Sequence, residues 1–207
     1  MTITVSVSAA VEGIVDEAVA RKLIAAAGGR PGPIYGKNGK PALREKISGY
    51  NHAARHAPWF VLVDLNGDAD CAVPFCKSWL PAPQRELCFR VAVRQVEAWL
   101  IADPAALAAY LTVARGRIPA NPENLSNAKT AMVNLARQSR HKAIQQDMVP
   151  REGSGRAVGP AYSSRLIEYV ESRWRPDVAA HHADSLRRAI NCLERLVSAW
   201  REPERQR

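Results

Sequence analysis

The sequence predicts an α/β protein with a parallel sheet, helices on both faces of that sheet, and a helical appendage after it. Three apolar, β-rich runs predict strands, at residues 3–11, 59–65 and 87–93. Helical patterns lie between these runs, and this alternation favours parallel strands covered on both faces. From about residue 105 onward there are helical patterns and loops but no strand pattern. We therefore expect an α/β domain over residues 1–112 and a helical appendage over residues 113–207 packed on it.

Local patterns predict the remaining elements of the first half. Residues 15–27 have apolar residues at helical spacing, and Gly28-Gly29 stops that helix. Residues 30–40 are rich in proline and glycine, which predicts a loop or a short edge strand followed by a basic turn. A second helix is expected over residues 41–56. Residues 66–86 contain three prolines, so we expect irregular structure there with one helical turn near residues 75–80.

The second half begins with a clear helix-start signal. Residues 94–102 predict the start of a helix, and Asp103-Pro104 predicts the N-cap and first turn of the next one. Four helices are expected in all from here, over residues 104–112, 126–146, 161–173 and 182–200, with a Gly-rich connection over residues 151–160. The five tryptophans are in apolar surroundings, which predicts core positions for Trp59, Trp79, Trp99, Trp174 and Trp200.

Composition limits the classes of partner. The 207 residues carry a net charge of +9, which favours nucleic acid, a nucleotide or another acidic partner; a solvated basic surface is the alternative. The four cysteines lack the spacing of a secreted domain, and the N-terminus is typical of a strand rather than a signal peptide. We therefore expect reduced thiols and a cytoplasmic protein. No apolar run approaches the roughly 20 residues needed to cross a bilayer, so no membrane partner is expected.

Acidic residues follow each of the three predicted strands. Glu12 ends the first run and Asp16 comes four residues later; Asp64 ends the second, with Asn66 and Asp68 at alternating positions; Glu97 follows the third. An extended segment would aim the side chains of Asp64, Asn66 and Asp68 the same way. The carboxyl ends of parallel strands meet at one edge, so these side chains should converge there. Clustered carboxylates do not ionise together cheaply without a cation, and Mg²⁺ or Mn²⁺ prefers oxygen ligands.

A structural alternative exists for each acid taken singly. Glu12 and Asp64 could be helix caps or first-turn acids, which stabilise a helix by roughly 0.3–1 kcal/mol each. The placement repeats after three strands, which favours the metal-site hypothesis for the group as a whole.

This pattern resembles a Toprim domain, the Rossmannoid fold shared by topoisomerases, primases and the OLD-family (overcoming-lysogenisation-defect) nucleases. The matching stretches are Val11 to Glu17 and Val61 to Asp68, and the segment Val93 to Asp103 resembles one bacterial branch of unknown function. Some members of that branch are encoded beside AAA-type ATPases in phage-defence loci. The resemblance covers about residues 3–112. It implies Mg²⁺ (or Mn²⁺) as cofactor, nuclease activity, and an AAA-type ATPase as a possible partner.

One position departs from the family pattern. Asn66 stands where the second Asp of an Asp-x-Asp is expected, and an amide oxygen is a neutral, weaker ligand. Asp68 or Asp70 would then supply the second carboxylate ligand in place of Asn66. The resemblance gives Glu12 the role of general acid/base or ligand, and Asp64 and Asp68 the role of ligands. The catalytic candidates are thus Glu12, Asp64 and Asp68, and the metal candidates are Glu12, Asp16, Asp64, Asn66, Asp68 and Glu97.

Basic residues in three stretches are candidates for contacting a nucleic-acid backbone. They are Lys37 and Lys40, Arg140 and Lys142, and Arg151 and Arg156 beside the glycines of residues 151–160. That glycine-rich stretch lacks the Gly-Lys-Ser/Thr ending of a phosphate loop, so a plain connector is the alternative.

The leading hypothesis is a metal-dependent nuclease acting on DNA or RNA. Three alternatives stay open. One is a non-catalytic module that binds nucleic acid or a partner ATPase, which Asn66 favours. Another is a small-molecule phosphotransferase, although glycine fingerprints for nucleotides are missing. The third is a zinc site made by His52, His56, Cys71 and Cys76.

Overall fold

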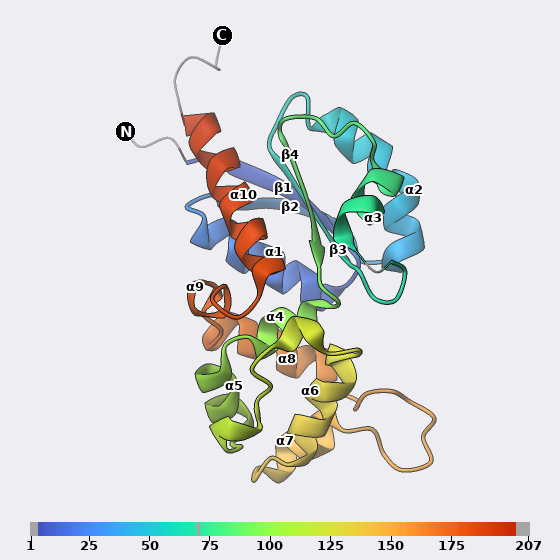
Figure 1. Cartoon of the computed structure of the whole chain (residues 1–207), viewed down its shortest axis with the longest axis vertical. Coiled ribbons are helices and arrows are strands. Elements are labelled where there is room, and N and C mark those ends of the chain that lie inside the picture. The colour runs from blue at the N-terminus through green and yellow to red at the C-terminus, as the bar shows by residue number, and fades with distance from the viewer. Residues whose placement is uncertain (1–3, 70, 202–207) are drawn as a thin grey trace.

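The computed structural model describes residues 4–69 and 71–201, and its centre is one four-stranded sheet (Figure 1). The strands are β1 (Ser6–Val11), β2 (Arg30–Gly36), β3 (Trp59–Asp64) and β4 (Leu87–Ala92). They lie in the order β2-β1-β3-β4, and every neighbouring pair is parallel. The prediction of an α/β fold with a parallel sheet followed by helices is confirmed. Residues 30–36 form an edge strand, one of the two structures predicted for that stretch.

Helices cover both faces of the sheet. One face is covered by α1 (Ile14–Ala26) and α10 (Asp184–Arg201), and the other by α2 (Gly39–Ala53) and α3 (Ala72–Trp79). Alternate residues of each strand point to opposite faces, so Phe60 packs on the α1 side and Val61 on the α2 side. This two-sided burial explains why the central strands are continuously apolar rather than alternating.

The remaining helices form a layer below the carboxyl edge of the sheet in Figure 1. They are α4 (Val96–Ile101), α5 (Pro104–Leu111), α6 (Ala128–Arg137), α7 (Lys142–Met148), α8 (Tyr162–Ser172) and α9 (Pro176–Ala179), with 3-10 turns at Arg115–Arg117 and Pro122–Asn124. The predicted cap is present, because Asp103 Oδ1 accepts a hydrogen bond from the Ala106 N–H.

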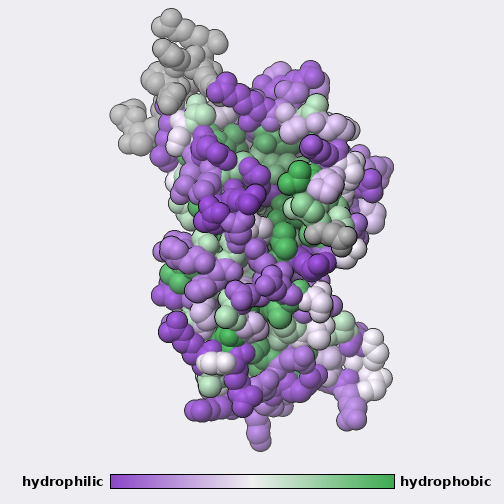
Figure 2. Space-filling view, in the orientation of Figure 1, coloured by the Kyte–Doolittle hydropathy of each residue, from purple (hydrophilic) through white to green (hydrophobic). Residues whose placement is uncertain are grey.

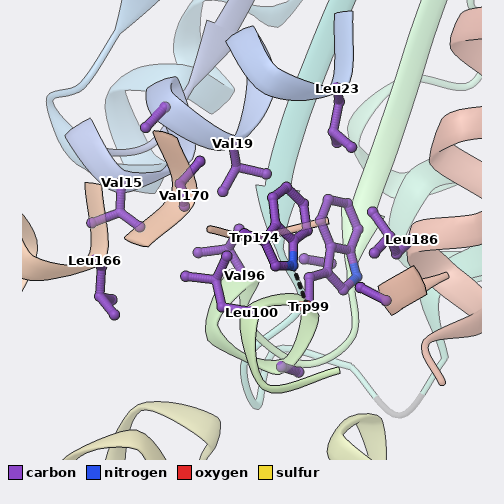
Figure 3. Close-up of a cluster of buried hydrophobic side chains, with 14 of the residues drawn as sticks. Val15, Val19, Leu23, Val96, Trp99, Leu100, Leu166, Val170, Trp174 and Leu186 are labelled. Carbon is purple, nitrogen blue, oxygen red and sulfur yellow. Dashed lines mark hydrogen bonds between the residues drawn. The ribbon is translucent and has the colours of Figure 1, made fainter. Parts of the chain in front are cut away.

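One continuous core joins this layer to the α1 face of the sheet. Figure 3 shows Trp99 and Trp174 near its centre, with Val19 and Leu23 of α1 on one side and Leu186 of α10 on another. The Trp174 indole donates to the Trp99 carbonyl at 3.1 Å, and the Trp99 indole donates to Ser185 Oγ at 2.7 Å. Four of the five tryptophans are buried and Trp200 is partly buried, as predicted. The chain after residue 112 thus supplies α6 to α9 of the lower layer and α10, which covers the sheet beside α1.

Two predicted elements differ from the structure. The single helix expected over residues 126–146 is wrong, because the chain turns between α6 and α7. There Ser139 Oγ accepts from the His141 N–H, and Gln145 Nε2 donates to the Ser139 carbonyl. These local hydrogen bonds replace helical ones. The segment over residues 66–86 contains a helix of eight residues, α3, rather than one turn, because Phe75 and Trp79 bury one face of it.

The surface in Figure 2 is mostly hydrophilic over α10 and the lower layer. Apolar residues gather between α3 and α10, in a hollow lined by Val73, Leu80 and Phe89 among others. No helix within the described residues has the length and apolar character needed to cross a bilayer.

Gly36 ends β2 at a close approach to β1, and this contact generates a prediction. Its φ is +90°, and a Cβ there would lie 2.2 Å from the Val11 carbonyl oxygen. We expect Gly36→Ala to lower the free energy of unfolding by about 1–3 kcal/mol. Urea unfolding measures this. The control is Gly49→Ala within α2, where a Cβ meets nothing within 4 Å and helix propensity predicts a gain of up to about 1 kcal/mol. Equal effects of the two variants would contradict the prediction.

Candidate functional site

Four carboxylates meet at the carboxyl edge of the sheet. Glu12 follows β1, Asp16 lies in the first turn of α1, Asp64 ends β3, and Glu97 lies in the first turn of α4 after β4. Asp16 and Glu97 are 7% and 3% exposed, and Glu12 and Asp64 are partly buried. The four are close enough that the charges of Glu12, Asp16 and Glu97 all act on Asp64. Parallel strands bring these residues together, since their carboxyl ends share one edge.

Burial and repulsion between neighbouring carboxylates disfavour the charged forms of Glu12, Asp16 and Asp64. Burial, together with the negative charges of Glu12 and Glu97, raises the pKa of Asp16 to about 7. Burial also raises the pKa of Asp64 well above its usual range, with added repulsion from Asp16 and Glu97. The pKa of Glu12 is raised by burial as well. The group therefore holds more negative charge than its surroundings neutralise.

Two carboxylate oxygens in this group have no hydrogen-bond partner among the residues that the structure describes. They are Asp16 Oδ1 and Glu97 Oε2, and both are buried. An unsatisfied buried acceptor costs about 1–3 kcal/mol, so each such group calls for a physical reason. A cation supplies one, because carboxylate oxygens are the ligands of hard divalent ions. The donor set, all oxygen, fits Mg²⁺ or Mn²⁺.

Backbone N–H groups hold the other two carboxylates in place. The Asp64 N–H donates to Glu12 Oε1, and the Val96 N–H donates to Asp64 Oδ1, both at 2.8 Å. The first bond ties the end of β1 to the end of β3, and the second ties β3 to the start of α4. These contacts fix the positions of the acids through the sheet itself.

Two lysines flank the group from opposite sides. Lys40 Nζ donates to the Asp64 carbonyl and to Asp68 Oδ2, both at 2.6 Å, and lies 3.9 Å from Glu12 Oε1. Lys129 Nζ lies 3.6 Å from Glu97 Oε1, which also accepts from the Tyr162 hydroxyl at 3.2 Å. The turn between β2 and α2 positions Lys40, since Gly39 has a φ of +83° and its N–H donates to the Glu12 carbonyl.

Lys129 and Tyr162 belong to α6 and α8, so the segment after residue 112 contributes to this site. Lys129 was not among the residues predicted from the sequence. No spacing signal marks it, because its approach to Glu97 depends on how α6 packs against α4.

The segment after Asp64 is not extended, so the expectation that the side chains of Asp64, Asn66 and Asp68 point the same way was wrong. Asn66 has a φ of +51°, and the Asp68 N–H donates to the Leu65 carbonyl, so the chain leaves the extended conformation directly after β3. Asn66 Oδ1 instead accepts from Gln95 Nε2 at 3.1 Å. Asp68 has a half-exposed side chain paired with Lys40. Asp70 lies outside the described residues.

The structure separates most of the predicted nucleic-acid contacts from the acids. Lys40 alone of the six contacts the group, judged on the contacts of the described residues. Lys37 pairs with Glu17 at 2.9 Å. Arg140 and Lys142 are exposed at the start of α7, and Figure 1 shows α7 at the end of the lower layer away from the sheet. Arg151 and Arg156 are exposed on the loop after α7.

Among the residues that the structure describes, no three His, Cys, Asp or Glu side chains already surround one metal position. The rings of His52 and His56 lie 6.2 Å apart, Cys71 is exposed and Cys76 is partly buried.

No protein-family model, curated protein or solved structure matches the chain. Functional conclusions therefore rest on the geometry of the site and on its electrostatics.

The raised pKa of Asp16 generates a prediction about stability and pH. Below about pH 4 this carboxyl is protonated in both the folded and unfolded states, so it has no effect. Between pH 4 and pH 7 the unfolded state loses the proton first, so ionisation destabilises the fold progressively. In EDTA we expect Asp16→Asn to gain stability over the wild type by about 2–4 kcal/mol as pH rises from 4 to 8. Urea unfolding across this range measures the difference.

The matched control is Asp177→Asn, which changes an exposed aspartate of α9. Its difference from the wild type should stay nearly constant over the same range. A constant difference for Asp16→Asn would show that Asp16 titrates normally.

Proposed function

We propose that this chain is a metal-dependent phosphoryl-transfer enzyme, a Toprim-like nuclease acting on DNA or RNA. The observation that carries the proposal is the group of four buried or partly buried carboxylates, two of which keep a buried oxygen with no hydrogen-bond partner in the described part of the chain. Buried charges of one sign are normally paired or bound to a metal. Placement at the carboxyl edge of a parallel sheet, in a chain of net charge +9, supports a polyanionic substrate.

Asp16, Asp64 and Glu97, with Glu12, would hold Mg²⁺ or Mn²⁺. When bound, such an ion supplies an activated water nucleophile and Lewis-acid stabilisation of the leaving oxygen. Tyr162 holds one oxygen of Glu97 by its hydroxyl, which leaves Oε2 free to act as a ligand. The N–H of Val96 likewise holds Asp64 by donating to its Oδ1, which leaves the other carboxylate oxygen of Asp64 to act as a ligand.

Lys129 is the residue best placed to contact the substrate phosphate. Its side chain is 44% exposed, and the ion pair with Glu97 at 3.6 Å is longer than a tight hydrogen bond. Its ammonium group can therefore turn from Glu97 to a phosphate oxygen and neutralise charge there. Lys40 is 17% exposed and bonded on two sides, which suits a role in holding the Asp64 segment.

Exposed arginines and lysines supply candidate contacts to the rest of the substrate. Arg140, Lys142, Arg151 and Arg156 are exposed, and contacts of this kind bind the phosphate backbone without reading sequence. The proposal therefore includes salt-sensitive binding with little sequence preference.

A second candidate function is a module that binds nucleic acid or an AAA-type ATPase without cutting. Asn66 favours it, because that amide faces Gln95 rather than supplying a carboxylate to the group. The ATPase partner is proposed on the resemblance to the bacterial Toprim-like branch alone.

Metal binding and cleavage can be measured on the same samples. We expect Mn²⁺ to bind in titration calorimetry and plasmid or single-stranded DNA or RNA to be cut in its presence. Asp64→Asn and Glu97→Gln should each lose at least about 100-fold in cleavage rate, since removal of an electrostatic stabiliser of this kind costs 10²–10³-fold. Both variants should bind Mn²⁺ more weakly, because each removes one charged ligand.

The matched control is Glu45→Gln, which removes an exposed acid of α2 away from the group. It should cut and bind metal like the wild type. Metal-independent nucleic-acid binding with no cleavage by the wild type would favour the non-catalytic module instead.

Lys129 provides a separate prediction, because it is expected to act on the substrate rather than on the metal. Lys129→Met should lower the cleavage rate at least about 10-fold while Mn²⁺ binds as tightly as before or more tightly, since a positive charge has been removed. Calorimetry and initial rates on one preparation test both parts. Loss of metal binding together with activity would assign Lys129 a structural role.

A further inference from the structure

Two cysteines meet where α10 covers the sheet. Cys88 lies on β4 with its side chain in the core facing α10, and Cys192 lies on α10 and packs against that core. The two thiols lie close enough to shift each other's pKa, and both residues line the same cavity. Cys88 is buried, whereas Cys192 is partly exposed. Both line an open cavity of about 380 Å³ together with Arg195, so a small molecule in solvent can reach the pair.

The surroundings of this pair favour a negative charge on one sulfur. The hydrogen bond from Cys88 lowers the pKa of Cys192 to about 6, and the positive charges of Arg90 and Arg195 contribute. Burial raises the pKa of Cys88, so that thiol keeps its proton. Arg90 lies beside both sulfurs, and its Nε is a buried donor with no acceptor within residues 4–69 and 71–201. A thiolate at Cys192 would place a negative charge beside this guanidinium.

We propose that Cys192 is a hydroperoxide-reactive thiol and that Cys88 is its resolving partner, so that oxidation closes a disulfide between α10 and β4. This modification site is separate from the proposed nuclease chemistry and does not depend on it. Two adjacent thiols, one accessible and one buried, flanked by arginines, are the arrangement that such chemistry requires.

The reaction balances in two steps. The Cys192 thiolate attacks one oxygen of the hydroperoxide, an S–O bond forms, the O–O bond breaks, and the other oxygen leaves and takes a proton from water. Cys88 sulfur then attacks Cys192 sulfur, the S–S bond forms, the S–O bond breaks, and water leaves with the Cys88 proton. The two sulfurs together lose two electrons and the peroxide gains them. A dithiol reverses the change.

The disulfide would fix α10 to an edge strand that also leads into the acidic group. Ser185, in the first turn of α10, accepts hydrogen bonds from the Val93 N–H after β4 and from the Trp99 indole of α4. Cys192 lies seven residues further along the helix, about 10 Å from Ser185. The cross-link would thus add a covalent tie to a helix already anchored at its start, and would close a long loop of the unfolded chain.

The test is oxidation of the full chain with about one equivalent of hydrogen peroxide, then alkylation of free thiols and peptide mapping without reductant. We expect one cross-link, Cys88–Cys192, that dithiothreitol reverses, and a rise in Tm of about 5 °C or more. Cys192→Ser should abolish both the cross-link and the shift. Cys88→Ala should leave a sulfenic acid at Cys192 that dimedone captures. The rate of alkylation of Cys192 should fall to half near pH 6.

Cys71 and Cys76 provide an internal control, since Cys71 precedes α3 and Cys76 lies within it, on the opposite side of the sheet, and both are free thiols as well. Cys71→Ser should leave the cross-link and the Tm shift unchanged. Oxidation confined to Cys71 or Cys76, or a Cys192 whose alkylation rate halves near pH 8 to 9, would overturn the proposal. The mapping uses the wild-type chain, so it remains decisive if a variant fails to fold.

Discussion

Repulsion among Asp16, Asp64, Glu12 and Glu97 is the interaction around which the rest of this structure is arranged. Four acids sit where three parallel strands end, and burial there raises the pKa of Asp16 to about 7. Hydrophobic packing of the sheet and helices must outweigh this electrostatic cost. The two-sided burial of β1 and β3 supplies that packing, and backbone N–H groups lower the cost for Glu12 and Asp64. A fold that maintains such a group against its own stability is typical of a functional site.

The helical segment after residue 112 also contributes to the surroundings of the four acids. Tyr162 and Lys129 reach Glu97 from α8 and α6, and Ser185 of α10 bonds to the chain between β4 and α4. Glu123 in turn accepts from the backbone N–H groups of Asp184 and Ser185 at the start of α10. Movement of α10 would therefore be transmitted to the segment that carries Glu97. The lower helical layer and the sheet share one hydrophobic core, so a shift of one layer would also move the other.

The local environment also separates acids that look alike in the sequence. Asp103 is fully buried, yet the Arg175 guanidinium beside it, together with the N–H groups of Ala106 and Arg175, holds its pKa below the usual range. Asp103 is therefore a satisfied structural cap. Asp16 is buried to a similar degree with an unpartnered oxygen and acidic neighbours. Hydrogen bonding, rather than burial, distinguishes the two.

Sequence patterns alone predicted the parallel α/β class, most element positions, the buried tryptophans and the Asp103 cap. These follow from periodicity and from short-range chemistry, which need no knowledge of distant contacts. The positions of Glu12, Asp16, Asp64 and Glu97 also predicted that these four acids would converge, because strand ends share an edge in any parallel sheet. Tertiary packing was needed to show that Asn66 and Asp68 turn away, that Lys129 and Tyr162 approach Glu97, and that Cys88 meets Cys192. The left-handed conformation of Asn66 breaks the alternation expected after β3, and the packing of α6, α8 and α10 sets the other contacts. The contacting residues are 29 to 104 positions apart along the chain, so no local spacing rule predicts them.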